Sequence, residues 1–121
     1  MIADHDRCAS AVRSFRVPIM RHRNFRGKLS YRHETKGETG REWFTVTVQP
    51  DGTRTHRAHC EMDDDAVLRD VITTMDGNWF PKDSYVRLSV GGKDEGSAWF
   101  LIDGNKATCE SWTKGAGRLS Q

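Results

Sequence analysis

Four side chains able to bind metal or carry protons lie within six positions of one another, in the stretch TRTHRAHCEM at 53–62. They are His56, His59, Cys60 and Glu61, which are residue types that ligate zinc or serve as nucleophile and base. Whether they form one site depends on the element that holds them. In a strand, successive side chains point to opposite faces, so the group would be divided.

The residues before this stretch favour a strand. Gln49-Pro50-Asp51-Gly52 suits a tight turn, because proline presets φ at the second position and glycine accepts a positive φ. The preceding EWFTVTVQ is dense in β-branched and aromatic residues, which are enriched in strands. We therefore predict a β-hairpin in which Gln49 pairs with Thr53.

Strand parity in this hairpin separates the four side chains. Val46 lies opposite His56 on one face, and Trp43 lies opposite His59 on the other. His56 and Cys60 share a face but stand about 13 Å apart, at roughly 3.3 Å per residue. A metal site within the stretch is thus disfavoured, and we predict neither metal nor cofactor.

Arg54 and His56 interrupt an otherwise apolar face of the predicted hairpin. A buried charge without a partner is costly, so this end of the face is either solvated or lines a cavity where the two side chains meet a polar ligand. Both alternatives stay open at this stage. If the protein is an enzyme, His56 is the candidate general acid or base, and no other catalytic residue is assigned.

Most other segments are predicted to be strands. FRGKLSYRH alternates apolar and polar residues from Phe25, and SYVRLSV, SAWFLID and ATCESW are short β-type runs between turn sequences. DDDAVLRDVITTMDG has apolar residues at helical spacing, but the β-branched residues at Val67 and 71–74 favour a strand. A helix there remains the alternative.

The predicted fold class is all-β, or α+β with one short helix if the alternative holds. Six or seven strands joined by short turns indicate an antiparallel β-meander, and closing a barrel usually takes about eight. We therefore expect a curved open sheet or half-barrel. The predicted organisation is a basic, loosely ordered N-terminal arm at 1–24 and a single β domain at 25–121.

Composition narrows the functional classes. Of the 121 residues 36% are hydrophobic, the net charge is +2, and no stretch approaches the roughly 20 apolar residues of a membrane span. Three cysteines without a CxxC motif fit free thiols of a reducing compartment, so a cytoplasmic location is expected. The chain contains no Gly-rich phosphate loop, GxSxG elbow or HExxH motif, and the prediction leans away from an enzyme.

The N-terminal arm continues into a basic run, RHRNFRGK at 21–28, with an aromatic residue inside it. Nucleic-acid binders often show such a run. Acidic residues dominate the rest of the chain, however, and no recognition helix or stacking motif accompanies it. Nucleic acid is therefore an unlikely partner on the sequence alone.

The run from Trp43 to Trp112 contains EWFTVTVQPDGTRTHRAHCEM, YVRLSV, GSAWFLID and ATCESW as successive strands of a meander. This pattern, over about 70 residues, resembles the bacterial lipocalin-like and glycolipid-binding proteins. The resemblance implies an antiparallel sheet curling around an apolar ligand, with aromatic side chains on the concave side. The chain departs from that pattern in having fewer strands.

The leading functional hypothesis is a module that binds a hydrophobic small molecule. One alternative is a structural or interaction domain that pairs through its sheet edges as a homodimer, and another is a cofactor-free lyase or isomerase using His56. The predicted ligand-binding residues lie on one concave face, which is formed by Tyr31, Phe44, Val46 and Trp99 with Arg54 and His56 as its polar groups.

Overall fold

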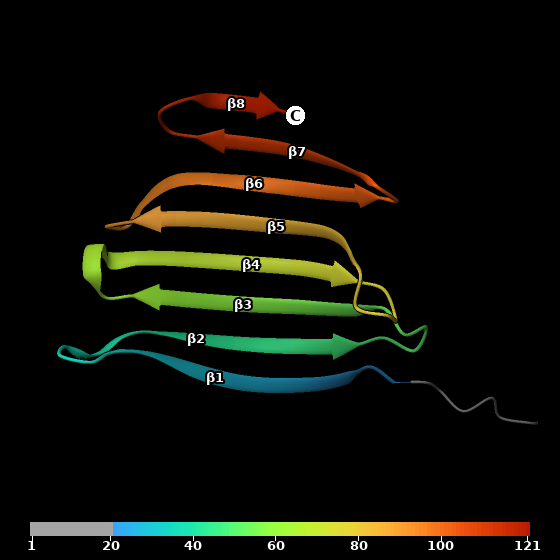
Figure 1. Ribbon diagram of the computed structural model, residues 1–121, viewed down its shortest axis with the longest axis horizontal. Coiled ribbons are helices and arrows are strands. Elements are labelled where there is room, and N and C mark those ends of the chain that lie inside the picture. The colour runs from blue at the N-terminus through green and yellow to red at the C-terminus, as the bar shows by residue number, and fades with distance from the viewer. Residues whose placement is uncertain (1–20) are drawn as a thin grey trace, which may run out of the picture.

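The computed structural model describes residues 21–121, which form one eight-stranded antiparallel sheet (Figure 1). The strands lie side by side in chain order. Their bounds are β1 Arg23–His33, β2 Gly37–Val48, β3 Arg54–Met62, β4 Val67–Met75, β5 Pro81–Val90, β6 Lys93–Asp103, β7 Lys106–Thr113 and β8 Gly117–Ser120. The predicted antiparallel meander and its open sheet are therefore confirmed. The count is eight because the C-terminal segment, which the sequence presents as the start of another strand, pairs with β7.

The sheet is a single layer, and within residues 21–121 no helix or second sheet covers either face (Figure 1). The side chains with the least exposure are Cys60 at 3% and Thr55 at 7%. The two edges, β1 and β8, are not paired with each other, so the sheet does not close into a barrel. Both faces of the sheet are thus available as surfaces.

The hairpin between β2 and β3 has the predicted register. The Gln49 N–H donates to the Thr53 carbonyl at 2.8 Å, and the Gly52 N–H donates to the Gln49 carbonyl at 2.9 Å. Gly52 has φ of 89°, which glycine adopts readily. The Thr53 N–H donates to the Asp51 carboxylate at 2.9 Å and lowers the pKa of Asp51. This turn fixes which side chains of β2 and β3 share a face.

The segment that the sequence leaves ambiguous is a strand. After the short 3-10 turn η1 (Asp64–Ala66), β4 pairs along its whole length with β3 and, with one shift near Met75, with β5. The helical alternative is therefore wrong. Its apolar residues at helical spacing include Val67 and Val71 on one face and Ile72 on the other. Cross-strand pairing on both sides prevails over the helical spacing.

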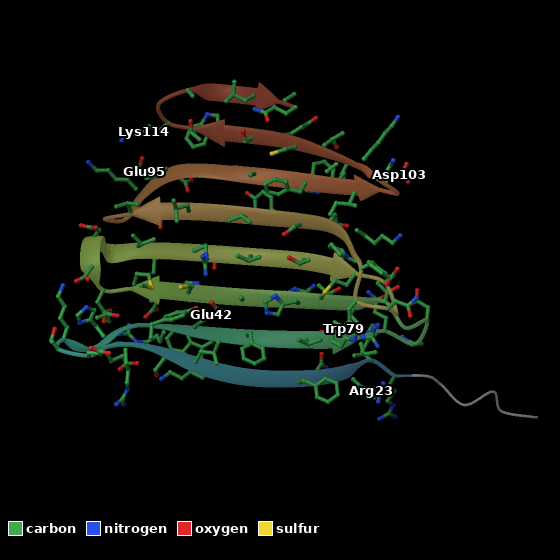
Figure 2. The ribbon with its side chains drawn as sticks, in the orientation of Figure 1. Arg23, Glu42, Trp79, Glu95, Asp103 and Lys114 are labelled. Carbon is green, nitrogen blue, oxygen red and sulfur yellow. The ribbon has the colours of Figure 1, made fainter. Side chains whose placement is uncertain are left out.

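The turns lie at the two ends of the sheet. Figure 2 shows Arg23, Trp79 and Asp103 at one end, and Glu95 and Lys114 at the other. β1 begins at Arg23, so the sheet starts two residues inside the predicted 1–24 arm. Residues 1–20 of that arm lie outside the described residues. In the described part of the chain no helix is long and apolar enough to cross a membrane.

Candidate functional site

The register assigns every strand residue to one of two faces. The first, face A, carries the residues that pair across the sheet with Phe44, Val46 and Cys60. The second, face B, carries those that pair with Trp43 and Thr45. On β2 to β6, face A includes Glu42, Phe44, Val46, Arg54, His56, Ala58, Cys60, Met62, Val67, Arg69, Val71, Thr73, Ser84, Val86, Leu88, Gly96, Ala98 and Phe100. Face B includes Arg41, Trp43, Thr45, Arg57, His59, Glu61, Asp70, Ile72, Tyr85, Arg87, Ser97 and Trp99.

Five of the six predicted ligand-binding residues share face A. Val46 pairs with His56, the Phe44 and His56 rings lie 6.1 Å apart, and Tyr31 of β1 pairs with Gly40. The Phe44 ring also covers Gly27, since a Cβ built on that glycine would meet the ring at 2.3 Å. The register thus brings Phe44, Val46 and His56 together as expected, with Tyr31 farther along the strands.

Arg54 lies on face A but is occupied by the loop between β4 and β5. Its guanidinium donates to the carbonyl oxygens of Asp76, at 3.2 Å, and Gly77. It also stacks on the Trp79 ring, 4.2 Å from the ring centroid. These contacts provide partners for the guanidinium at the end of β3. The solvated-end interpretation of Arg54 therefore fits the structure better than the cavity interpretation.

Trp99 lies on face B and does not join the predicted group. It pairs with Tyr85 on one side and Glu110 on the other, both on face B. The assignment to the same face as Phe44 is therefore wrong. SAWFLID is apolar at both odd and even positions, so its alternation could not indicate which side chains face which way.

A polar cluster on face A was not identified from the sequence. The Tyr31 hydroxyl donates to the Glu42 carboxylate at 2.7 Å, and an Arg69 nitrogen lies 3.6 Å from the same carboxylate. The Glu42 side chain is 13% exposed and that of Arg69 is 47% exposed. The hydrogen bond from Tyr31 is the main cause that raises the pKa of its phenol. Arg69 therefore reaches solvent beside a carboxylate that already accepts a hydrogen bond from Tyr31. Only the pairing of three strands brings these side chains together.

Two shallow depressions meet on face A at Leu88. One, of about 340 Å³, is lined by Tyr31, Cys60, Met62, Val67, Arg69 and Leu88. The other, of about 220 Å³, is lined mainly by Val86, Leu88, Gly96, Ala98, Ser111 and Thr113. Small side chains make its floor. Together they form an apolar trough with the Arg69 cluster at one end.

Face B holds a second histidine whose surroundings are better organised than those of His56. His59 Nδ1 lies 2.7 Å from Asp70, and its Nε2 lies 3.5 Å from Glu61. The hydrogen bond with Asp70 is the main cause that raises the pKa of His59. Its ring also stacks on Trp43 at 6.1 Å and 25°. Treating 67–75 as a strand in register would have placed Asp70 opposite His59.

Arg41 organises the acidic end of face B. It pairs with Glu61 at 2.9 Å and Asp63 at 2.7 Å, and these bonds raise the pKa of its guanidinium. Within residues 21–121 no three His, Cys, Asp or Glu side chains lie close enough to hold a metal ion. The stretch 53–62 is divided between the faces as parity predicts.

Comparison with known proteins found no relative: no protein-family model, curated protein sequence or solved structure matches this chain.

Proposed function

We propose that this protein is a binding module that holds a hydrophobic small molecule with a polar head group on face A. The observation that carries the proposal is the apolar trough at Leu88, which ends at the Tyr31–Glu42–Arg69 cluster. Ligand sites are mostly apolar and contain a few polar groups that fix orientation. The trough has this composition, and the larger of its two depressions falls at the lower end of the usual volume range.

Arg69 is the polar group best suited to a ligand. Its Glu42 partner already accepts from Tyr31 and stands 3.6 Å away, which leaves guanidinium donors of this half-exposed side chain for an anionic head group. Arg69 thus takes the role that the sequence suggested for Arg54. His56 provides a second polar position, beside the Thr73 and Ser84 hydroxyls, which bond each other at 2.8 Å.

A second candidate is a homodimer in which face A of one copy covers face A of another. It is favoured by the extent of the apolar surface, because face A carries apolar side chains on all eight strands, from Phe25 and Leu29 on β1 to Leu119 on β8. Edge pairing through β1 is less favourable, since Arg26 and Lys28 would bring like charges together. A small ligand leaves much of this apolar surface uncovered, whereas a second copy could cover most of it.

Fluorescence of dansylundecanoic acid, which has an anionic head and an apolar chain, tests the proposal. Intrinsic tryptophan emission is a poor reporter, because Trp43, Trp99 and Trp112 lie on face B and Trp79 lies in the loop between β4 and β5. We expect saturable emission with one probe per chain, competed by an unlabelled fatty acid. Arg69→Gln should weaken binding about tenfold, which corresponds to about 1.4 kcal/mol for a lost charge-assisted contact.

Arg57→Gln is the matched control, because Arg57 is an exposed arginine in the centre of the sheet on face B. It should leave the probe affinity unchanged. Absence of saturation, or an equal loss in both variants, would contradict the proposal. Light scattering on the same samples distinguishes the ligand proposal from the homodimer. A stable dimer that does not bind the probe would favour the homodimer.

A further inference from the structure

Face B carries a group of exposed aromatic rings and a group of cations. Residues that pair across neighbouring strands form rows that cross the sheet, and the aromatic and cationic groups lie toward opposite ends of two such rows. One row runs Arg26–Thr45–Arg57–Ile72–Tyr85–Trp99–Glu110 across β1 to β7. The next row places Lys28 and Trp43 at the same end as Arg26, and Trp112 beside Trp99. Neither feature is visible from the sequence, because each row draws one residue from each strand.

The cationic group consists of Arg26, Lys28 and Arg57, which we call the basic corner. All three side chains are exposed. The ion pairs found within residues 21–121 use Lys36, Arg41, His59, Arg69 and Arg87. In this part of the chain the basic corner therefore has no carboxylate within 4 Å. Its Lys28 ammonium lies 5.3 Å from the Trp43 ring centroid, which positions a cation beside an aromatic plane.

The aromatic group consists of Tyr85, Trp99 and Trp112, which are 41%, 46% and 39% exposed. With Ser97, Glu110 and Arg118 they line a depression of about 420 Å³. A second depression of about 550 Å³ lies toward the basic corner and is lined by Arg26, Trp43, Arg57 and Ile72 among others, including Asp70, which is bonded to His59. Rings this large in water lose the gain from burial, so they mark a surface that contacts another molecule.

This surface is complementary to a molecule that has an anionic backbone and flat aromatic bases. Proteins that bind single-stranded nucleic acids combine cations that follow the phosphates with aromatic side chains on which bases stack. From Arg26 to Trp99 the row crosses five strand spacings of about 4.8 Å, or roughly 24 Å, enough for several nucleotides. At the aromatic end Glu110 and Arg118 line the same depression, so their charges offset each other and the phosphate contacts of the strand are placed at the basic corner.

We propose that face B binds single-stranded nucleic acid, with phosphates on Arg26, Lys28 and Arg57 and bases stacked on Tyr85, Trp99 and Trp112. The sequence disfavours this partner because the basic run at 21–28 stands alone in it. The register adds Arg57 from β3 and the aromatic row from β5 to β7. The site is independent of the ligand proposed for face A.

The test is a titration of the full chain with a 12-nucleotide single strand of mixed sequence, followed by tryptophan quenching. We expect saturable quenching, and an affinity that falls with salt at a slope of about −2 on logarithmic axes, for three phosphate contacts at about 0.7 each. The same sequence as a duplex should bind at least tenfold more weakly, because its bases cannot stack on side chains.

Two pairs of variants separate charge from stacking. Arg57→Ser should reduce the salt slope by about 0.7, whereas Lys93→Ser, at the exposed first position of β6, should not change it. Trp99→Leu should weaken binding about tenfold with the slope unchanged, consistent with the loss of one stacking contact. Phe100→Leu, on face A of the same strand, should have no effect, and Trp99→Phe should keep most of the affinity.

Three results would contradict the proposal. Inorganic polyphosphate that competes as well as the oligonucleotide would show a charge-only surface for acidic partners. Equal effects of Trp99→Leu and Phe100→Leu, with circular dichroism showing both folded, would remove the stacking role. Absence of saturable quenching at low salt would remove the site. None of these results affects probe binding on face A.

Discussion

Around Arg41 and His59 the charged side chains of face B bond to one another, whereas the centre of face A has no polar side chain that could form such bonds. Arg41 joins two carboxylates and His59 joins Asp70 across neighbouring strands of face B. The central row of face A runs through Ala58, Val71, Val86 and Ala98, none of which carries a polar group. Each Å² of apolar surface buried on face A contributes about 25 cal/mol, whereas face B presents exposed aromatic rings such as Trp43 and Trp99 together with charged side chains. The same sheet thus offers one surface with an apolar centre and one that mixes aromatic rings with charge.

The glycines inside the strands are also distributed unevenly between the two faces. Gly27, Gly40 and Gly96, which lie inside strands, all fall on face A. In each case a Cβ would stand under 3.0 Å from a neighbouring atom. Face A is therefore packed closely at these three points, and Gly96 contributes to the floor of its trough.

The largest expected effect comes from placing one charge on either face. Val71→Lys puts an ammonium in the central apolar row of face A, and a charge desolvated by an apolar ligand is costly. We expect dansylundecanoic acid to bind at least 100-fold more weakly. Ile72→Lys, the next residue of β4, points to face B and should leave the probe affinity within threefold. Similar losses in both variants would show that the faces are not functionally distinct.

Gly40→Ala tests the close packing of face A. The new Cβ would lie 2.5 Å from the Glu61 carbonyl oxygen and 2.7 Å from Met62 Sδ. Because the first of these is backbone, we expect a loss on the order of 2 kcal/mol in the free energy of unfolding, measured in urea. Gly115→Ala is the control, since nothing lies within 4 Å of its Cβ position and its φ is not positive. A neutral Gly40→Ala would mean that β2 and β3 separate easily at this point.

Arg54→Met tests whether this arginine holds the loop between β4 and β5. It removes two hydrogen bonds to loop carbonyls and the stacking on Trp79, and should cost about 1 kcal/mol. Amide exchange at 76–80 should accelerate more than exchange elsewhere. Arg57→Met, on face B of the same strand, should leave this loop unchanged. A loss of probe binding without faster exchange would instead return Arg54 to the ligand site.

The smallest effect is a pH dependence on face B. Asp70 raises the pKa of His59 above its ordinary 6.5, so the charged ring is favoured in the folded state. This contribution is fully present below about pH 6.5 and disappears as pH rises through the raised pKa. Since the His59 side chain is 41% exposed, we expect only a few tenths of a kcal/mol. Urea titrations at pH 6 and 8 measure it, and Asp70→Asn should reduce the difference, with Glu61 as the remaining carboxylate beside the ring.

The sequence was sufficient to predict what depends on local chemistry. The Gln49 to Gly52 turn has residues suited to each of its positions, so it fixed the β2–β3 register and the separation of His56 from His59. The β-branched residues of 67–75 indicated a strand despite their helical spacing. These inferences use neighbours in sequence, where steric preference is strong.

The rest depended on pairing between strands whose register no turn residue specified. Trp99 was assigned to the wrong face because its strand is apolar at both parities. The Tyr31–Glu42–Arg69 cluster joins β1, β2 and β4, and the aromatic row joins β5, β6 and β7. Arg54 could not be interpreted without the loop carbonyls that it binds. A single error of register along the meander would reverse the face of every later residue.

The strand order has a consequence for how the chain reaches this state. Every strand pairs only with its neighbours in sequence, and each connection is short, so no long loop must close before a contact forms. Hairpins can therefore form independently and join along the sheet. Unfolding should begin at the β8 edge of the sheet, because β8 has four paired positions whereas β1 has eleven. Hydrogen exchange should accordingly progress inward from Gly117–Ser120, strand by strand, before it reaches the centre.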